Sequence, residues 1–378
     1  MAPRSRPSAP VGYRSTSCGT TDSSTWSTSA PRTPMSTGSA PGGSSDSRPR
    51  RPAPRPTRVF SLNKKGTPMT AERDAAVTVL STDFAEMPQG ADTLEDGSLV
   101  CVDVNNGDLI TWSPGNGKLV VARTSSGPIG LVMGRDENAY LAHTGGHIGD
   151  FWTAPDAIDP CIQILHLGTT LPHTVLTEVE GRPLIAPHDI CWGADGRLWF
   201  TDSNIWRWDE EERTEPGAII AIDPDGTASV VVETGPDFPC GIVGDADGAV
   251  YWGESYRDRI MRRDPDGSVS LYYQLPEGHV PHALRFSADG SLWVASFGSS
   301  TVDVVAPDGS SIREIPLGDG IHPMSLSFEG TTLYVTAFRE IEGDEMVGDL
   351  FAIDAGIAGA PVIRGSLIQS TLGQEQAV

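Results

Sequence analysis

One sequence context, the position directly after a proline, is shared by four residues with chemically useful side chains: Gln89, His188, Cys240 and His282. Two imidazoles and a thiolate at one point would suit zinc or iron, or nickel or copper, far better than calcium. A metal held by His188, Cys240 and His282 would keep an open position and activate water for attack on an acyl carbon. Gln89 is expected to be a fourth ligand or to polarise the substrate. The alternatives are that no metal binds and the side chains line a polar pocket, or that the site holds a hard metal.

Repeats are the elements that would bring these residues together. Six Pro-X dipeptides recur at intervals of roughly 40 to 60 residues, a spacing typical of propeller blades. They are Pro88-Gln89, Pro128-Ile129, Pro187-His188, Pro239-Cys240, Pro281-His282 and Pro323-Met324. In the first five, an Asp follows seven residues after X, and a strand-like run such as RLWFTD (197–202) comes next. This pattern predicts an all-β, six-bladed β-propeller, in which every X residue lies near the central axis.

The second half of each unit reads as an outer hairpin, so each blade is expected to have four strands. Asp-Gly turns between apolar runs mark these hairpins, as in residues 218–234. A strand at 77–80 is expected to complete the last blade, and further strands are predicted at 350–353 and 361–363. This arrangement would close the ring without free sheet edges. The longest insertion is predicted at 144–173, where it would line or gate a site.

Composition divides the 378-residue chain into two parts. Residues 1–68 are rich in Pro, Ser, Thr, Arg and Gly and are predicted to be a disordered extension before a propeller at 69–378. The hypothesis is that this extension is a mis-assigned start and that Met69 is the natural one. The first part carries 11 basic and 2 acidic residues, and the second carries 16 basic and 48 acidic residues. Such an acidic body argues against nucleic acid and anionic membranes as partners and favours a small-molecule substrate. Five cysteines without a CxxC pair suggest a cytoplasmic protein with reduced thiols, whose oligomeric state stays open.

A second set of mostly polar residues lies at the end of the second strand of each unit. The alternation of side chains along a strand should direct these residues towards the axis as well. Asp202 and Glu254 are candidates to orient an imidazole or to act as general base, and His143 is expected to reach the site. Structural carboxylates that bond turn amides are the alternative. Ile129, Met324 and His322, together with Gln89, are the predicted substrate-binding residues. Four other histidines are predicted to lie at the surface: His147, His166, His173 and His279.

Several segments resemble the gluconolactonase, regucalcin and luciferin-regenerating enzyme family of six-bladed propellers. They are GRPLIAPHDICWGADGRLWFTD (181–202), PCGIVGDADGAVYWGE (239–254), PHALRFSADGSLWVA (281–295) and GPIGLVMGRDENAYLAHTGG (127–146). The resemblance runs from about residue 84 to 365. It implies a divalent metal at the bottom of the funnel, which polarises a lactone carbonyl and activates water while an acidic residue acts as base. The family holds this metal with a Glu in the first unit, Asn in the third and fourth, and Asp in the fifth.

This chain departs from the family at each of those positions, which hold Gln89, His188, Cys240 and His282. The fold expectation is unaffected, because it depends on the repeat skeleton. The function is expected to be a lactonase-type hydrolase that opens a lactone or related cyclic ester by metal- or histidine-activated water. Alternatives are a cyclase, isomerase or condensing enzyme acting in the same funnel, or a small-molecule binding protein. Cys240 as a covalent nucleophile is a further alternative.

Overall fold

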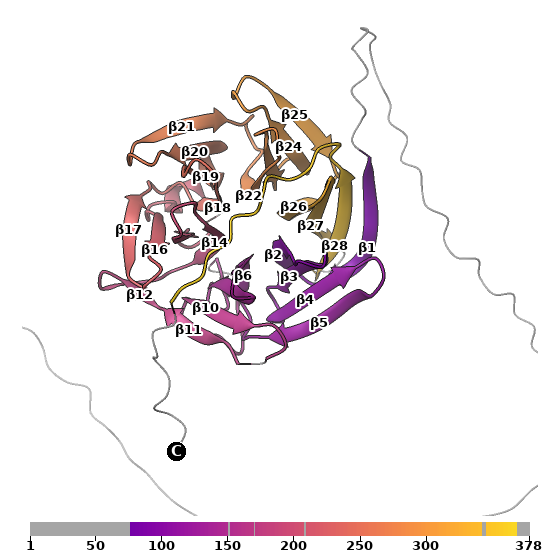
Figure 1. Ribbon diagram of the computed structural model, residues 1–378. Helices are drawn as coiled ribbons and strands as arrows, with labels where there is room; N and C mark the ends of the chain where they lie inside the picture. Colours follow the sequence, from indigo (N-terminus) through magenta and orange to yellow (C-terminus); the bar gives the residue numbers. More distant parts are fainter. Residues whose placement is uncertain (1–75, 150–151, 170, 208, 342–344, 369–378) are drawn as a thin grey trace, which may run out of the picture. The chain divides into compact units, whose positions relative to one another are not determined.

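The computed structural model describes residues 76–149, 152–169, 171–207, 209–341 and 345–368. Within these residues the chain forms six four-stranded antiparallel sheets arranged as blades around a central axis (Figure 1). The predicted all-β, six-bladed propeller is therefore confirmed. The predicted extension at 1–68 lies outside the described residues. No described helix has the length and hydropathy needed to cross a membrane.

The strands follow one another from the axis outward. The inner strands are β2 (Pro88–Thr93), β6 (Pro128–Met133), β14 (Pro187–Trp192), β18 (Pro239–Gly244), β22 (Pro281–Phe286) and β26 (His322–Glu329). The second strands are β3 (Leu99–Asp103), β7 (Asn138–His143), β15 (Leu198–Asp202), β19 (Val250–Glu254), β23 (Leu292–Ser296) and β27 (Thr332–Ile341). The third strands are β4 (Asp108–Ser113), β10 (Cys161–His166), β16 (Ala218–Ile222), β20 (Arg259–Arg263), β24 (Thr301–Val305) and β28 (Glu345–Asp354). The outer strands are β5 (Gly117–Arg123), β11 (His173–Leu176), β17 (Ala228–Glu233), β21 (Val269–Gln274), β25 (Ile312–Pro316) and β1 (Val77–Ala85).

Short elements decorate the connections between these strands. Two small hairpins pair β8 (His147–Ile148) with β9 (Trp152–Thr153) and β12 (Glu178–Val179) with β13 (Arg182–Pro183). Two single turns of 3-10 helix cover Glu210–Glu212 and Ser255–Arg257. The predicted insertion at 144–173 was too long, because Cys161–His166 is the third strand of the second blade.

The Asp-Gly signals make tight turns between inner and second strands. In the third blade the Asp195 carboxylate accepts hydrogen bonds from the Arg197 amide (3.1 Å) and the Trp199 indole N–H (3.2 Å). Gly196 takes φ 82°, a left-handed conformation that glycine adopts without steric cost. The turn fixes the register in which Cys191 pairs with Trp199. Sequence alone therefore determines which residues of the third blade face its neighbours.

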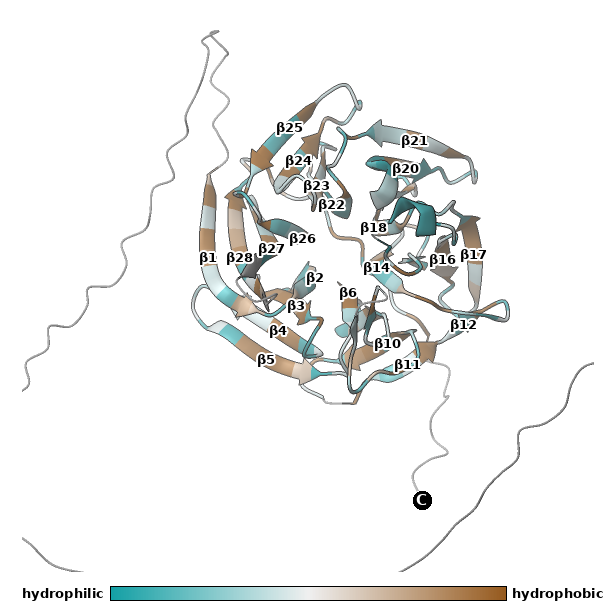
Figure 2. Ribbon diagram, turned by 180° about the vertical axis from the view of Figure 1, so that it is seen from behind, coloured by the Kyte–Doolittle hydropathy of each residue, from teal (hydrophilic) through white to brown (hydrophobic). Residues whose placement is uncertain are grey.

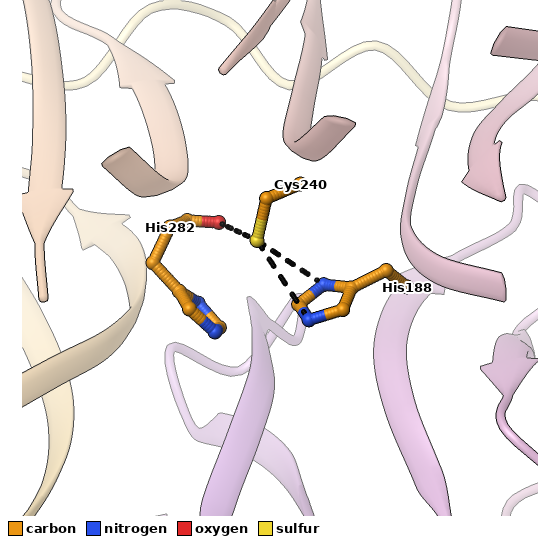
Figure 3. A group of neighbouring side chains, drawn as sticks. All are labelled: His188, Cys240 and His282. Carbon is orange, nitrogen blue, oxygen red and sulfur yellow. Dashed lines mark hydrogen bonds between the residues drawn. The ribbon is translucent and has the colours of Figure 1, made fainter. Parts of the chain in front are cut away.

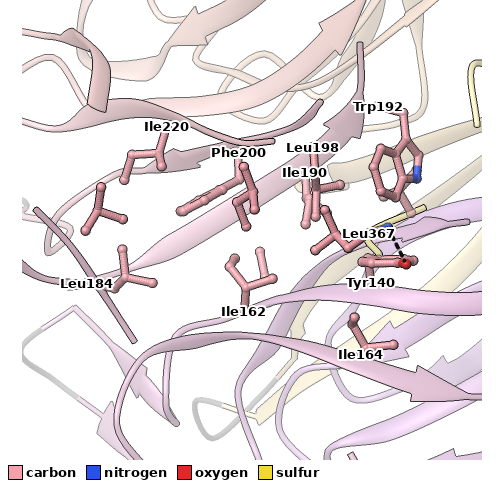
Figure 4. Packing of buried hydrophobic residues seen from close by; sticks show 14 of the residues in the cluster. Tyr140, Ile162, Ile164, Leu184, Ile190, Trp192, Leu198, Phe200, Ile220 and Leu367 are labelled. Carbon is pink, nitrogen blue, oxygen red and sulfur yellow. Dashed lines mark hydrogen bonds between the residues drawn. The ribbon is translucent and has the colours of Figure 1, made fainter. Parts of the chain in front are cut away.

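Hydrophobic packing between adjacent blades forms the core. Between the second and third blades, Tyr140 and Ile162 meet Ile190 and Phe200, all with at most 1% of their surface exposed (Figure 4). Burial of each such side chain contributes about 1.5–3 kcal/mol. The outer strands instead mix hydrophobic and hydrophilic residues, as the changing colours along β1 and β5 show (Figure 2).

The ring closes through strands from opposite ends of the described chain. β1 pairs antiparallel with β28, with Val77 opposite Ile353 and Val79 opposite Phe351. The prediction that the N-terminal strand completes the last blade is confirmed. This pairing removes the open edge that the first and last blades would otherwise expose.

After β28, residues 355–368 form a strap that crosses one face of the ring (Figure 1). The predicted strand at 361–363 is wrong, because this segment has no continuous strand partner. The strap is held instead by single contacts, among them the Arg364 guanidinium on the Asp92 carboxylate and the Leu367 amide on the Tyr140 hydroxyl. A cavity of about 80 Å³ lies between the strap and the inner strands and is lined in part by Arg285 and Ile363.

Candidate metal centre

Three of the post-proline side chains meet at the axis. His188 on β14, Cys240 on β18 and His282 on β22 come from three consecutive blades (Figure 3). Their potential ligand atoms all lie within 4.8 Å of one another. The Cys240 Sγ lies 3.4 Å from Nδ1 and 3.7 Å from Nε2 of His188. The centroids of the two imidazole rings are 5.0 Å apart.

Local irregularities in the inner strands aim these side chains. In every inner strand the regular pairing shifts at or directly after the Pro-X dipeptide, for example between Pro187 and Ile190. A shift of this kind turns the local side chain away from the normal strand alternation. The backbone geometry shared by the six inner strands, rather than any single loop, therefore directs the post-proline side chain to the axis.

Glycine allows neighbouring inner strands to approach closely at the site. A Cβ on Gly241 would lie 2.6 Å from the His282 carbonyl oxygen, and one on Gly130 would lie 2.5 Å from the His188 carbonyl oxygen. Both distances are too short for a carbon atom. Only glycine at these two positions lets the strands that carry the two histidines take the observed positions.

Burial and one hydrogen bond set the protonation of the three groups. The His282 Nδ1–H donates to the Met324 carbonyl oxygen at 2.8 Å, which leaves the Nε2 lone pair available. Burial lowers the pKa of His282 to about 4. Burial also lowers the pKa of His188, and repulsion between two protonated rings at this distance adds to that effect. Burial, followed by the Asp189 carboxylate, raises the pKa of the Cys240 thiol, whose Sγ lies 3.3 Å from the His282 carbonyl oxygen. Without a cation the site thus holds two neutral imidazoles and a neutral thiol.

The donor set tests which metal fits. Calcium takes six to eight oxygen ligands, whereas these three residues offer nitrogen and sulfur. Tetrahedral zinc, with ligands at about 2.0–2.3 Å, separates neighbouring donor atoms by roughly 3.3–3.8 Å. The 3.4 Å between Cys240 Sγ and His188 Nδ1 lies within that interval. The whole set lies within 4.8 Å, so one donor pair has the tetrahedral spacing and the donor chemistry decides the metal. Nitrogen and sulfur donors fit zinc or a similar transition metal and do not fit calcium.

The other post-proline residues divide into one polar and two apolar positions. Gln89 has 2% of its surface exposed, and its Nε2 has no hydrogen-bond partner among the described residues. An unpaired buried amide N–H costs about 1–3 kcal/mol, so this donor is available for an acceptor that binds later. Ile129 and Met324 instead pack in a buried apolar cluster with Met87 and Phe338.

The residues that end the second strands bond to their own loops. Asp202 accepts from the Ala186 amide at 2.7 Å and from the Ile185 amide at 3.2 Å, while burial raises its pKa. Glu254 is paired with the Arg259 guanidinium at 2.5 Å and accepts from the Trp252 indole N–H. These contacts match the structural alternative for both carboxylates, and neither belongs to the His188 cluster. A catalytic role for Asp202 or Glu254 stays a prediction.

His143 is also occupied by its own loop. Its Nδ1 accepts from the Gly145 amide at 2.9 Å, and its Nε2–H donates to the Ser125 carbonyl oxygen at 3.2 Å. Burial lowers its pKa to about 4. The ring therefore joins two loops as a neutral group.

Four other histidines were predicted to lie at the surface, and three of them do. His147, His166 and His173 are exposed, as predicted. The prediction of a surface position for His279 is wrong: it is 7% exposed, and its Nδ1 lies 2.6 Å from the buried Asp303 carboxylate. The sequence places His279 in a turn, and it does not show that Asp303 on β24 of the same blade pairs with this histidine.

Aromatic residues beside the cluster were missed by the sequence analysis. Phe238 meets the His188 ring edge-on at a centroid distance of 5.7 Å, and Phe297 stacks near His282 at 6.2 Å. His322, predicted to bind substrate, stacks on Phe297 at 4.6 Å. The only signal in the sequence that could have indicated Phe238 is its place directly before Pro239, next to the post-proline position that faces the axis.

Comparisons with known proteins agree with this architecture. The solved structures that resemble the chain include a gluconolactonase from Xanthomonas campestris, with 18% identity and a TM-score of 0.58 over 75% of this chain and 90% of that one. A calcium-binding protein, regucalcin, from Agrobacterium tumefaciens has 17% identity and a TM-score of 0.59, covering 77% of this chain and 98% of its own. A luciferin-regenerating enzyme has 14% identity and a TM-score of 0.60, covering 78% and 100%. At these identities the likeness establishes the fold alone.

The family assignment comes from the sequence. No curated protein was found to match the chain. The family model described as the SMP-30/gluconolactonase/LRE-like region matches residues 88–339, from the first inner strand into the last blade. The match covers more than half of the 378 residues and includes all six post-proline positions. The chain therefore belongs to the SMP-30/gluconolactonase/LRE-like family.

Proposed function

We propose that the protein is a hydrolase that opens a lactone or related cyclic ester at a transition-metal centre held by His188, Cys240 and His282. The observation that carries this proposal is the convergence of two imidazoles and a thiol within 4.8 Å at the axis. Membership of a family that includes gluconolactonases supports the reaction class.

Zinc, or secondarily iron, would act when bound as a Lewis acid that polarises the ester carbonyl and lowers the pKa of water. The protein residues prepare the site for it. The Met324 carbonyl fixes the tautomer and orientation of His282. Because burial lowers the pKa of both imidazoles, they offer lone pairs at neutral pH without first losing a proton. Cys240, in contrast, must release its proton, so metal uptake should be accompanied by release of about one proton.

Gln89 supplies the polar contact to the substrate in this proposal. Its buried Nε2 lacks a partner among the described residues, and Gln89 occupies the same post-proline position as the three ligands. A neutral amide donor can stabilise negative charge that develops on an ester oxygen. Loss of such a donor typically lowers kcat by about a hundredfold or more.

The test begins with metal content. The full chain, purified without a metal-affinity tag or chelator, is assayed by elemental mass spectrometry, alone and after addition of zinc. We expect about one metal per chain, which His188→Ala and His282→Ala should lose. His166→Ala, at an exposed histidine of β10, is the matched control. Absence of bound metal after addition of zinc, manganese and calcium would overturn the metal centre.

The reaction is tested separately. Hydrolysis of a panel of lactones is followed by pH-stat, with incorporation of oxygen from ¹⁸O-labelled water into the product acid. Incorporation that depends on the bound metal supports the proposal. Turnover without incorporation would identify a non-hydrolytic enzyme on the same scaffold, and saturable binding without turnover would identify a binding protein.

A further inference from the structure

Two groups of aromatic residues extend outward from the two imidazoles of the metal centre. The first group, beside His188, consists of Trp206, Phe238 and Tyr256. The second group, beside His282, consists of Phe297, His322 and Phe338. Both groups therefore flank the place where a substrate would meet the metal.

The backbone conformation of Phe238 places the first group. Phe238 has φ 54°, a left-handed conformation that costs a bulky residue roughly 1–2 kcal/mol. Its carbonyl accepts a hydrogen bond from the Ser255 amide at 3.0 Å, which fixes this conformation. The ring then lies 4.9 Å from Trp206 and 5.3 Å from Tyr256. Val280, which precedes Pro281, has the same conformation with φ 52°, so the backbone of the repeat sets this conformation and places the Phe238 ring beside His188.

The second group joins an apolar wall. Phe297 stacks on His322 at 4.6 Å with an interplanar angle of 26°, and it lies 5.8 Å from Phe338. Phe297 and Phe338 pack with Ile129 and Met324, the post-proline residues of the second and sixth blades. The axis thus has metal-ligating side chains on three blades and apolar side chains on two.

Exposure shows which of these rings a ligand can reach. Phe238 and Phe338 are 8% and 6% exposed, so they support the other rings from behind. Trp206, Tyr256 and Phe297 each keep an intermediate part of their surface exposed, and so does His282. Aromatic faces next to a partly exposed ligand histidine are suited to contact an apolar substituent of a substrate.

Apart from Gln89, three polar side chains near the aromatic groups are engaged with the protein itself. The Ser203 and Ser255 hydroxyls donate to the carbonyl oxygens of Pro239 and Pro281. The Glu254 carboxylate is paired with Arg259. Recognition of a sugar requires hydroxyls and carboxylates that face the ligand, and these three side chains are not available for that purpose.

From these observations we propose that the substrate is a neutral lactone or cyclic ester with an aryl or alkyl substituent, and that polyhydroxylated sugar lactones bind poorly. The inference rests on the proposed function. The aryl or alkyl substituent would lie against Phe297 and the first aromatic group, with the ester directed to the metal centre. Polyhydroxylated rings would lose hydration there and regain few hydrogen bonds, because the free Gln89 amide donor serves the ester itself.

Binding is measured on the metal-free full chain, so that the result does not depend on hydrolysis. Isothermal titration compares γ-phenyl-γ-butyrolactone with glucono-δ-lactone. We expect the phenyl lactone to bind at least about tenfold more tightly, the scale set by burial of a few apolar carbons. Phe297→Ser should weaken its binding about tenfold. Tyr272→Ser, on the outer strand β21, is the matched aromatic-to-serine control and should bind as the wild type does.

Phe238→Gly provides an independent second variant, since glycine adopts the left-handed backbone without strain. It should also weaken binding of the phenyl lactone about tenfold. Equal or tighter binding of glucono-δ-lactone, or wild-type binding of the phenyl lactone by both variants, would overturn the inference. Tight binding of the phenyl lactone without metal-dependent hydrolysis would support the inference while refuting the proposed reaction.

Discussion

The buried His143 should make the stability of the fold depend on pH in a way that one substitution removes. Its ring is 0% exposed, and its Nδ1 accepts the Gly145 amide, so the folded protein requires the neutral form. Burial lowers its pKa to about 4, although the hydrogen bond to the Ser125 carbonyl and the charge of Asp156 act in the opposite direction. In the unfolded chain a histidine has a pKa of about 6.5.

The sign follows from which state binds the proton. Between pH 6.5 and 4 the unfolded chain holds a proton on His143 and the folded protein does not, so acid favours unfolding. The full difference in pKa corresponds to about 3.4 kcal/mol, of which about 2 kcal/mol is lost by pH 5. Stability from this residue is thus present above pH 6.5 and decreases towards pH 4.

The assay compares the wild type with His143→Asn by urea unfolding at several values between pH 7.5 and 5, with EDTA present to remove metal. Asparagine can keep an acceptor for the Gly145 amide but does not titrate. The wild type should be the more stable at pH 7.5, and its advantage should shrink by about 2 kcal/mol at pH 5. His166→Asn controls for loss of a histidine from the same blade. A difference between wild type and His143→Asn that stays constant over this pH range would refute the reasoning.

Three further predictions concern packing and the strap. Asp303→Ala removes a buried acceptor that serves His279, Ser296 and Thr301, and it should destabilise the protein by about 3–5 kcal/mol in urea unfolding. A loss below about 1 kcal/mol would contradict the importance of this buried hydrogen-bond network. Gly241→Ala places a carbon against the His282 carbonyl and should weaken zinc binding at least about tenfold in a chelator competition. Unchanged zinc affinity would show that the strands adjust freely. Arg364→Ala should speed amide hydrogen exchange of the strap and leave metal content unchanged, whereas unaltered exchange would show that the strap is held by its other contacts.

The sequence predicted those features that the repeat specifies. Because strand alternation and turn chemistry recur in every unit, the position after each proline could be assigned to the axis, and His188, Cys240 and His282 do meet there. The closure of the last blade by the strand at 77–80 followed from the same count of strands. Metal binding at this site stays a prediction.

Features without a repeat could not be predicted. Phe238 lies in a connecting loop, where no spacing rule indicates the direction of a ring. Residues 361–363 are apolar enough for a strand, yet they pair with none, and the strap is held by bonds of its other residues, such as the Ala360 amide on the Phe286 carbonyl oxygen. Cys161–His166 was taken for part of an insertion because no Asp-Gly turn follows it. In each case tertiary contacts decided the structure.

Pairing of β1 with β28 has a consequence for the time course of folding. Five blades consist of strands that are consecutive or nearly so in the chain, so each can form as soon as it leaves the ribosome. The sixth blade forms last, because its outer strand β1 is synthesised first and its other strands, β26 to β28, are synthesised last. Until translation has passed Asp354, β1 has no partner, and the growing ring keeps an open edge that a chaperone or another nascent chain can bind.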